Sequence, residues 1–485
     1  MASMDTNPTS FPSRLRAIAS STPHEIAITH EQTSITWQDL DRQSNRVAHA
    51  LISRGIGLGD LVSIALPNGI DYFLASWGIW KVGATPQPVS ASLPQAELNA
   101  ILAVAGSRFL ITNSISSPQC ASASIEQLLI DIDDDSPPSD CVSPSWKAPT
   151  SGGSTGTPKV IRCTLPATYS VAVEQFFRLV KEDVALIPAP LYHNAPFVLA
   201  TRVLLAGAHL IIMSRFEPEQ TLTILEKNAA TFVYLVPTMM NRIAKLQPEP
   251  KRFDLSSLQT LWHMAEPCPA WLKQYWIDWI GGDKVWEIYA ATEGVASTQI
   301  NGIEWLAHRG SVGKPTLPQQ IRAFSDGGEM LPPLEIGELY MYGGDAAAVT
   351  YQYLGAEAKA LGDWHSMGDI GYVDHEGYVY LCDRRRDRII VGGVNIYPAE
   401  IEAALLEHSA VQSCAIIGLP CDDRGQKIHA IVQGHLSEQD IMSWLSERLV
   451  KYKWPHSIEF VEYSLRDEAG KVRRSQLAAE RTGKI

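Results

Sequence analysis

Long apolar segments and an excess of basic charge are both missing from this sequence. No run of about 18 apolar residues occurs, and residues 1–16 are rich in Ser and Pro without the apolar core of a signal peptide. Lys and Arg total 40 against 53 Asp and Glu, a net charge of −13. Long-range attraction to nucleic acid or anionic lipid is therefore not expected. We predict a cytoplasmic protein with no membrane span and no nucleic-acid partner.

The cysteines lack the spacing of a structural framework. There are seven, an odd number, and no Cys-x-x-Cys pair occurs, which disfavours both a disulfide scaffold and a zinc ribbon. This composition favours a reducing compartment. Because the net charge is negative, any anionic ligand must be held by local donors.

Size and composition indicate a globular protein of more than one domain. The chain has 485 residues, above the limit of about 250–300 residues for one hydrophobic core. Hydrophobic residues make up 45% and charged residues 19%, a balance typical of globular proteins. Thr36 and Asp39 predict a capped helix start, the apolar run 61–66 predicts a strand, and a helical pattern follows through residues 73–77. This alternation predicts an α/β fold.

A segment rich in glycine and hydroxyl groups, residues 150–159, predicts an anion-binding loop. Glycine lets successive N–H groups converge, hydroxyls add donors and a lysine adds charge, which suits a polyphosphate. A Ser/Gly linker is the ordinary alternative, but an apolar pair follows at once and the segment lies inside a long globular chain. A Walker loop is excluded because Thr157-Pro158 separates the last glycine from the lysine. The candidate ligand contacts are Thr150, Ser151, Gly152, Gly153, Ser154, Thr155, Gly156 and Lys159.

These ten residues resemble the phosphate loop of the adenylate-forming (ANL) superfamily, which includes acyl-CoA synthetases, luciferases and peptide-synthetase adenylation domains. The resemblance continues over nearly the whole chain in the family order. The further motifs are Tyr-Ala-Ala-Thr-Glu-Gly at 289–294, Gly-Asp-Ile-Gly at 368–371, Asp-Arg-Arg-Arg-Asp-Arg at 383–388 and Gly-Lys at 470–471. The resemblance implies a large, multi-subdomain N-terminal adenylation domain, residues 1–385, and a small mobile α+β C-terminal domain, residues 386–485.

The resemblance also implies roles for residues of the nucleotide site. Tyr289 would stack on adenine, Thr292 would contact the α-phosphate, and Glu293 would hold Mg²⁺. Asp369 would bind both ribose hydroxyls, and Arg384 would contact the same ribose.

The residues matched to the acyl pocket indicate the kind of acid. Amino-acid-activating members carry an aspartate for the substrate ammonium where this chain has His193 and Asn194, so an amino acid is a poor candidate. Segments 192–196 and 304–315 look most like bile-acid and terpenoid-acid coenzyme A ligases, which favours a polycyclic, steroid-like or aromatic acid. His193 is also a candidate catalytic residue. By the same resemblance, the pocket and the adjoining adenine contact comprise His193, Asn194, Val236, Met239, Met264, Ala265, Glu266 and Ala290.

Two of these residues depart from the Gly-Gly-Ala-Pro pattern that is usual in the family. Met264 would fill pocket volume, and Glu266 would accept a hydrogen bond from the adenine amino group. Leu465 likewise stands where the terminal motif usually has proline.

The C-terminal motifs imply a moving domain. Arg386 matches the hinge, Gly392 and Gly393 match the turn past which pantetheine runs, and Lys471 matches the lysine that bridges the substrate carboxylate and the α-phosphate. Rotation about Arg386 would withdraw Lys471 after adenylation. The local pattern of this domain predicts strands at 388–391 and 411–418 and helices at 398–408 and 439–450.

We therefore predict an AMP-forming acyl-CoA ligase that uses ATP, Mg²⁺ and coenzyme A to activate a carboxylic acid. Charge neutralisation and positioning would supply the catalysis. The alternatives are an amide synthetase, an enzyme that thioesterifies preformed acyl-AMP, a luciferase-type oxygenase and a non-catalytic adenylate-binding protein. The sequence leaves open which acid is used and whether the protein is a monomer or a homodimer.

Overall fold

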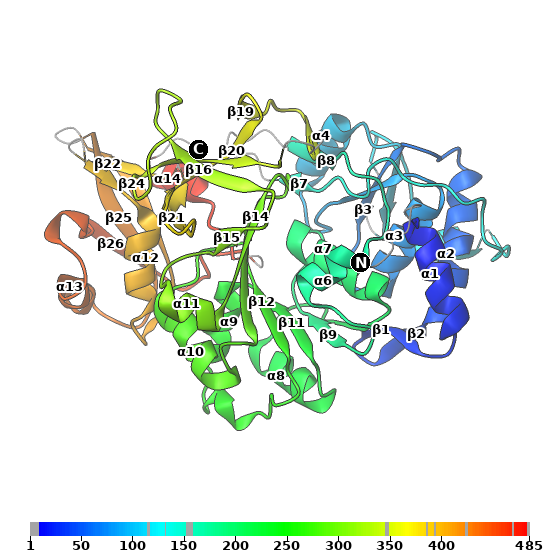
Figure 1. Cartoon of the computed structure of the whole chain (residues 1–485), viewed down its shortest axis with the longest axis horizontal. Coiled ribbons are helices and arrows are strands. Elements are labelled where there is room, and N and C mark those ends of the chain that lie inside the picture. Colours follow the sequence, from blue (N-terminus) through cyan, green and yellow to red (C-terminus); the bar gives the residue numbers. More distant parts are fainter. Residues whose placement is uncertain are drawn as a thin grey trace.

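The chain forms a large body and a smaller one beside it, blue to yellow and orange to red in Figure 1. The computed structural model describes residues 9–113, 117–130, 132–151, 159–344, 349–384, 387–391, 394–421, 425–467 and 470–482. Helices and strands alternate through most of the large body. The predicted α/β class is confirmed.

The large domain is built on a mixed sheet with the strand order β15-β14-β13-β12-β11-β9-β10-β1-β2. The six central strands pair parallel with one another, in the order β13, β12, β11, β9, β10 and β1. The outer pairs are antiparallel: β2 with β1, β14 with β13, and β15 with β14. The strands are β1 (Ile26–His30), β2 (Thr33–Thr36), β9 (Val184–Ile187), β10 (His209–Ile212), β11 (Phe232–Leu235), β12 (Thr260–His263), β13 (Val285–Ala290), β14 (Ser297–Asn301) and β15 (Lys314–Pro315).

Smaller sheets flank this main sheet. A parallel sheet has the order β4-β3-β5-β6, an antiparallel one has the order β18-β8-β7, and another has the order β16-β17-β20-β19 with β21 paired to β20. Their strands are β3 (Leu61–Ala65), β4 (Thr85–Pro88), β5 (Phe109–Thr112), β6 (Ala121–Ala123), β7 (Thr150–Ser151), β8 (Lys159–Cys163), β16 (Gln320–Phe324), β17 (Gly337–Tyr342), β18 (Tyr351–Leu354), β19 (Lys359–Leu361), β20 (Trp364–Val373) and β21 (Val379–Arg384).

The helices of the large domain cover these sheets, and their starts follow local signals. The Thr36 side chain accepts from the Asp39 N–H, which confirms the predicted cap of α2. Gly78 of α3 lies against α2 so closely that a Cβ there would be 2.4 Å from Val47 Cγ1. The helices are α1 (Phe11–Ser21), α2 (Trp37–Ile52), α3 (Ile70–Lys81), α4 (Gln95–Ala105), α5 (Ile125–Ile130), α6 (Val171–Phe177), α7 (Asn194–Ala206), α8 (Pro218–Lys227), α9 (Pro237–Ala244), α10 (Ala270–Ile280) and α11 (Gly302–Ala307), with a 3₁₀ turn at Pro250–Arg252.

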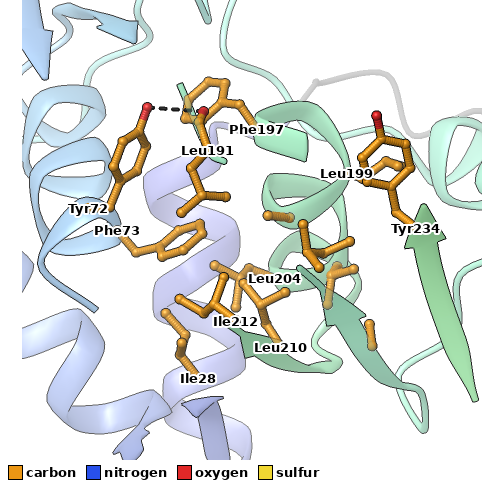
Figure 2. Close-up of a cluster of buried hydrophobic side chains, with 14 of the residues drawn as sticks. Ile28, Tyr72, Phe73, Leu191, Phe197, Leu199, Leu204, Leu210, Ile212 and Tyr234 are labelled. Carbon is orange, nitrogen blue, oxygen red and sulfur yellow. Dashed lines mark hydrogen bonds between the residues drawn. The ribbon is translucent and has the colours of Figure 1, made fainter. Parts of the chain in front are cut away.

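The core of the large domain is aromatic and aliphatic, and it joins the main sheet to helices α3 and α7. Figure 2 shows Phe73 near the aliphatic side chains of β1 and β10, and Phe197 near Leu191. The Tyr72 hydroxyl, buried here, donates to the Leu191 carbonyl at 3.1 Å. This bond ties α3 to the segment that leads into His193, so the core fixes one wall of the candidate site.

The small domain has its own sheet and its own core. Its sheet has the order β23-β22-β25-β24, with β26 paired parallel to β25. Alternate residues of β24 face opposite sides: Ile416 packs with Leu405 of α12, and Ile417 packs with Leu477 of α14. The elements are β22 (Ile389–Val391), β23 (Val394–Ile396), α12 (Pro398–Leu406), β24 (Val411–Cys421), β25 (Gly425–Gly434), α13 (Glu438–Ser446), a 3₁₀ turn at Lys451–Lys453, β26 (Ser457–Val461) and α14 (Arg474–Thr482).

The two strands and two helices predicted for the small domain are all present, with shifted ends: β24 runs on to Cys421 and α12 ends at Leu406. Helix α13 ends at Ser446 rather than near residue 450. Leu449 packs against the same core without being helical, so the apolar pattern continues beyond the helix. The domain boundary at 385/386 lies outside the described residues and stays a prediction.

No helix in the described ranges is long and apolar enough to span a bilayer. All seven cysteines are free thiols.

Candidate active site

The ends of β11, β12 and β13 bring distant segments to one edge of the main sheet. Val236 follows β11, Met264 follows β12, and Tyr289 lies near the end of β13. These strands are parallel neighbours in register, so their carboxyl ends lie side by side. In α/β sheets this edge is where ligands bind.

The residues matched to adenine and ribose are joined by direct contacts. The Tyr289 hydroxyl donates to Asp369 Oδ2 at 2.8 Å, and Arg384 Nε lies 3.4 Å from Asp369 Oδ1. Strands β20 and β21 pair Asp369 with Arg384. Burial, and then the Asp369 carboxylate, raise the pKa of Tyr289 well above its usual value, so the phenol remains a neutral donor. The structure therefore brings these three predicted residues together.

Lys159, the last residue of the predicted phosphate loop, lies beside Glu293. Its Nζ is 3.6 Å from Glu293 Oε1 and 4.0 Å from the centre of the Tyr353 ring. The Tyr353 hydroxyl donates to the same Glu293 oxygen at 2.5 Å. Tyr353 belongs to no motif recognised in the sequence. It reaches the site because β18 pairs with β8, a contact between segments far apart in the chain.

Glu293 fits the predicted magnesium-binding role. Its side chain is 7% exposed, and the described part of the chain contains no cluster of three or more His, Cys, Asp or Glu side chains that could hold a metal. Mg²⁺ is usually bound through one or two carboxylates together with waters and substrate phosphates rather than by a full protein cage. One glutamate next to a predicted phosphate loop matches that donor set. The assignment of Mg²⁺ to Glu293 stays a prediction.

Lys147 is a site residue that the sequence analysis missed. Its buried amine donates to Asn194 Oδ1 and, at 3.4 Å, to the Thr292 carbonyl, so the partners in its shell are neutral oxygens. Burial lowers the pKa of Lys147 to about 8. Cys163 and Glu293 oppose this shift, and the positive charge of Arg202 adds to it. Lys147 therefore links Asn194, in the segment 192–196 matched to the acyl pocket (the acyl segment), to Thr292 of the motif at 289–294.

His193 lies at the N-terminal end of α7 and faces the small domain's catalytic candidate. Its Nε2 is buried and has no hydrogen-bond partner among the described residues. Burial, and then the positive charge of Lys471, lower the pKa of His193 to about 3, so the ring is neutral at ordinary pH. The charge of Lys471 in the small domain therefore acts on His193 in the large domain.

The other residues matched to the acyl pocket differ in exposure. Val236 and Met239 are buried, and Met264 is partly buried against the main core. Ala265 adopts φ +79° in the turn after β12, and Ala290 is exposed at the end of β13. Their contacts with an acid or adenine stay predictions.

Glu266 is held by side chains of both domains. Thr238 donates to it through N–H and Oγ1, each at 2.9 Å, and Arg466 Nη1 lies 3.3 Å from Oε2. Burial raises the pKa of Glu266 to about 7, against the opposing effects of Arg466 and Thr238. In this arrangement the carboxylate is engaged before any adenine binds, and the predicted adenine contact stays untested.

Several predicted residues lie at or beyond the limits of the described chain. Thr150 and Ser151 form β7, and Ser151 pairs with Lys159 across the hairpin. Outside the described residues are Gly152, Gly153, Ser154, Thr155, Gly156, Arg386, Gly392 and Gly393.

Comparison with known proteins identifies the family of the chain. The sequence pattern described as AMP-binding enzyme matches residues 15–354. The chain belongs to the AMP-binding enzyme family. The pattern of the AMP-binding enzyme C-terminal domain matches residues 400–471. The predicted fold of a large and a small domain and the predicted class, AMP-forming ligases of the acyl-CoA synthetase type, are confirmed.

Characterised relatives in the AMP-binding enzyme family span almost the whole chain. A feruloyl-CoA synthase of Amycolatopsis sp is 32% identical over 474 residues, covering 94% of this chain and 96% of the relative. A 2-succinylbenzoate–CoA ligase of Bacillus subtilis is 28% identical and covers 98% and 99%. A solved structure of o-succinylbenzoate coenzyme A synthetase from Bacillus subtilis, in complex with ATP and magnesium ion, has a TM-score of 0.83 at 26% identity, covering 97% of this chain and 99% of that one.

Proposed function

We propose that this AMP-binding enzyme converts a carboxylic acid and ATP to acyl-AMP and pyrophosphate, then transfers the acyl group from AMP to the coenzyme A thiol. The observation that carries the proposal is that a lysine of each domain acts on a residue matched to the active site. Lys159 lies beside Glu293, and the charge of Lys471 reaches His193 on the acyl segment. Lys159 of the large domain and Lys471 of the small domain would thus both act on the bound acid and ATP.

The first half-reaction brings two anions together. A carboxylate oxygen attacks the α-phosphorus, and pyrophosphate leaves with the electron pair of the broken P–O bond. Lys159 and Lys471 would neutralise negative charge, and preorganised charges of this kind act without reorganisation during the reaction. Mg²⁺ bound at Glu293 would supply further charge neutralisation on phosphate oxygens. Tyr289 and Asp369 would hold the nucleoside.

In the second half-reaction the thiolate attacks the acyl carbon and AMP leaves. Lys471 has no role in this step, so the small domain can move away. A hinge rotation would carry Lys471 out of the cleft and admit pantetheine past Gly392 and Gly393.

We infer that the acid is aromatic or otherwise bulky. His193 is neutral and Asn194 is uncharged, so the segment carries no group that would pair with a substrate ammonium. The names of the feruloyl and 2-succinylbenzoate relatives favour an aromatic acid. The resemblance of segments 192–196 and 304–315 to bile-acid and terpenoid-acid ligases favours a polycyclic acid as the next choice.

A panel of acids tests the proposal. Pyrophosphate release is measured with cinnamic, benzoic, steroid-like and short aliphatic acids, each with coenzyme A, with a set of amines, and with neither. We expect acid-dependent release with an aromatic or polycyclic acid and formation of a thioester. Amide formation without any requirement for coenzyme A would contradict the ligase assignment, and exclusive turnover of acetate would contradict the inferred acid.

A further inference from the structure

The turn that carries Lys471 contacts the large domain at the Glu266 carboxylate. Arg466, five residues earlier, lies 3.3 Å from Glu266 Oε2 and also donates to the Gly470 carbonyl at 2.9 Å. The two partners are 200 positions apart in the chain. Their side chains are 12% and 7% exposed, so the ion pair is shielded from water and is screened little by salt.

Gly470 allows the close approach of this turn. A Cβ on Gly470 would lie 1.9 Å from Glu266 Oε1, and the residue has φ +77°. Any side chain there would overlap the carboxylate and strain the backbone. The residue next to Lys471 therefore lies directly against Glu266.

The large domain fixes the Glu266 carboxylate before the turn arrives. Thr238 donates to one oxygen through its N–H and to the other through its hydroxyl. Thr238 is in the first turn of α9, whose Pro237 has no N–H to compete. Two donors from one residue hold both oxygens, so the carboxylate has a defined orientation.

The small domain fixes Arg466 in the same way. Arg466 Nη2 donates to Glu402 Oε2 of α12 at 2.9 Å, and Glu402 also accepts from Arg474 of α14. Arg474 pairs in turn with Asp387. The guanidinium is therefore attached to two helices of its own domain, and its contact with Glu266 transmits the position of the whole domain.

An independent contact supports the same domain orientation. Lys245, directly after α9, donates to the carbonyls of Leu406, His408 and Val411, at 2.9, 3.4 and 2.7 Å. These carbonyls include one at the end of α12, where a helix leaves acceptors unpaired and favours a cation. The two contacts flank the same helix of the small domain.

We propose that Glu266 is a positioning residue for acyl-AMP formation: paired with Arg466, it seats the Gly470–Lys471 turn so that the Lys471 amine is held toward the bound acid. Glu266 acts through Lys471 and takes no part in bond making. This inference rests on the proposed two-step function, because a residue that seats Lys471 matters only to the step that uses it.

The test separates the half-reactions in Glu266→Gln, which keeps the size and an oxygen acceptor but removes the charge. Acid-dependent exchange of labelled pyrophosphate into ATP reports acyl-AMP formation. Thioester formation from supplied acyl-AMP and coenzyme A reports the second step. We expect exchange to fall about 10–100-fold, the range for breaking a hydrogen bond to a charged group, and thioester formation to stay within about twofold of the unmodified chain.

A matched control is available on the same domain. Glu219 pairs with Arg252 at 2.5 Å on the surface, far from both motifs, and Glu219→Gln should leave both half-reactions unchanged. Equal losses of both half-reactions in Glu266→Gln, or no loss in exchange, would overturn the positioning role.

Failure of the proposed function has a different signature. If the unmodified chain gives no acid-dependent exchange, the ligase proposal fails, and hydrogen–deuterium exchange then decides on the contact itself. In Glu266→Gln the amides of segment 464–471 should exchange faster, with β24 unchanged as an internal reference. Identical exchange of segment 464–471 in both proteins would refute the seating contact without reference to activity.

Discussion

The interior of the large domain and its boundary with the small domain use different kinds of contact. In the interior, Phe11 and Trp80 pack edge to face at 5.2 Å, and Trp80 packs against Phe197. At the boundary, the defining contacts are Glu266 with Arg466 and Lys245 with backbone carbonyls. Apolar packing holds one domain together, and directional polar contacts orient the other.

This difference has a physical consequence. Apolar burial is non-directional and scales with area, so it tolerates small displacements. A hydrogen bond weakens steeply when its geometry is lost, so a polar boundary favours one orientation and releases it completely once the domains move. The small domain has a separate core around Leu405 and Ile416, which would allow it to move as a unit.

Leu405→Ala tests whether the two cores are independent. Leu405 is fully buried in the small-domain core, and such a truncation costs about 2–5 kcal/mol. We expect faster hydrogen exchange throughout β24 and β25, with the large-domain strands unchanged. Val450→Ala, at an exposed position of the same domain, is the control. Equal loosening of both domains would show a shared core.

Lys471→Ala removes the cation that the boundary positions. We expect acyl-AMP formation to fall by about 10²–10³-fold, as for loss of a preorganised charge-stabilising group, while supplied acyl-AMP is still converted to thioester. Pyrophosphate exchange and thioester assays on one preparation measure both. Lys451→Ala, a surface lysine on the same domain, should behave as the unmodified chain. Unchanged adenylation would remove Lys471 from the mechanism.

His193→Asn tests the lowered pKa of the imidazole at the N-terminal end of α7. The pKa of His193 is about 3 in the folded chain and 6.5 as its reference value. The unfolded state thus binds the extra proton between these values, and stability falls as pH drops below 6.5. We expect the free energy of unfolding to fall by about 2 kcal/mol more from pH 7 to pH 5 in the unmodified chain than in the variant. Urea titrations at each pH measure it, with exposed His435→Asn as reference.

Lys147→Met tests whether the amine orders the acyl segment rather than the core. The variant keeps volume and loses donors to Asn194 and Thr292. We expect a KM for the acid about 30-fold higher, from loss of two hydrogen bonds at about 1 kcal/mol each, with the KM for ATP little changed. Steady-state kinetics with each substrate varied measure the split. A fall in kcat alone would contradict this role, and Lys181→Met, on the surface, should change neither constant.

Residues in local patterns were predictable from the sequence. The cap at Thr36, the strand in β3 and the helix that begins at Pro398 each depend on neighbours within one or two turns. The residues of the Tyr289–Asp369–Arg384 contact were predicted through separate motifs, and only the fold shows that they meet.

Residues whose role depends on distant strands were not predictable. Tyr353 reaches Glu293 through the pairing of β18 with β8, and Lys147 lies in an irregular segment without periodicity. The sequence marked Glu266 as unusual but gave no sign of Arg466, because nothing local links positions 200 residues apart.

The spacing of the parallel strands β11, β12 and β13 sets the distance between the segments that follow them. Adjacent strands lie about 4.8 Å apart, so their tips span about 10 Å, roughly the length of a substituted aromatic ring. Deleting one residue from β12 would draw the 264–266 segment back by about 3.3 Å and turn its side chains to the opposite face. The length of each strand is thus as much a determinant of the site as the identity of the side chains beyond it.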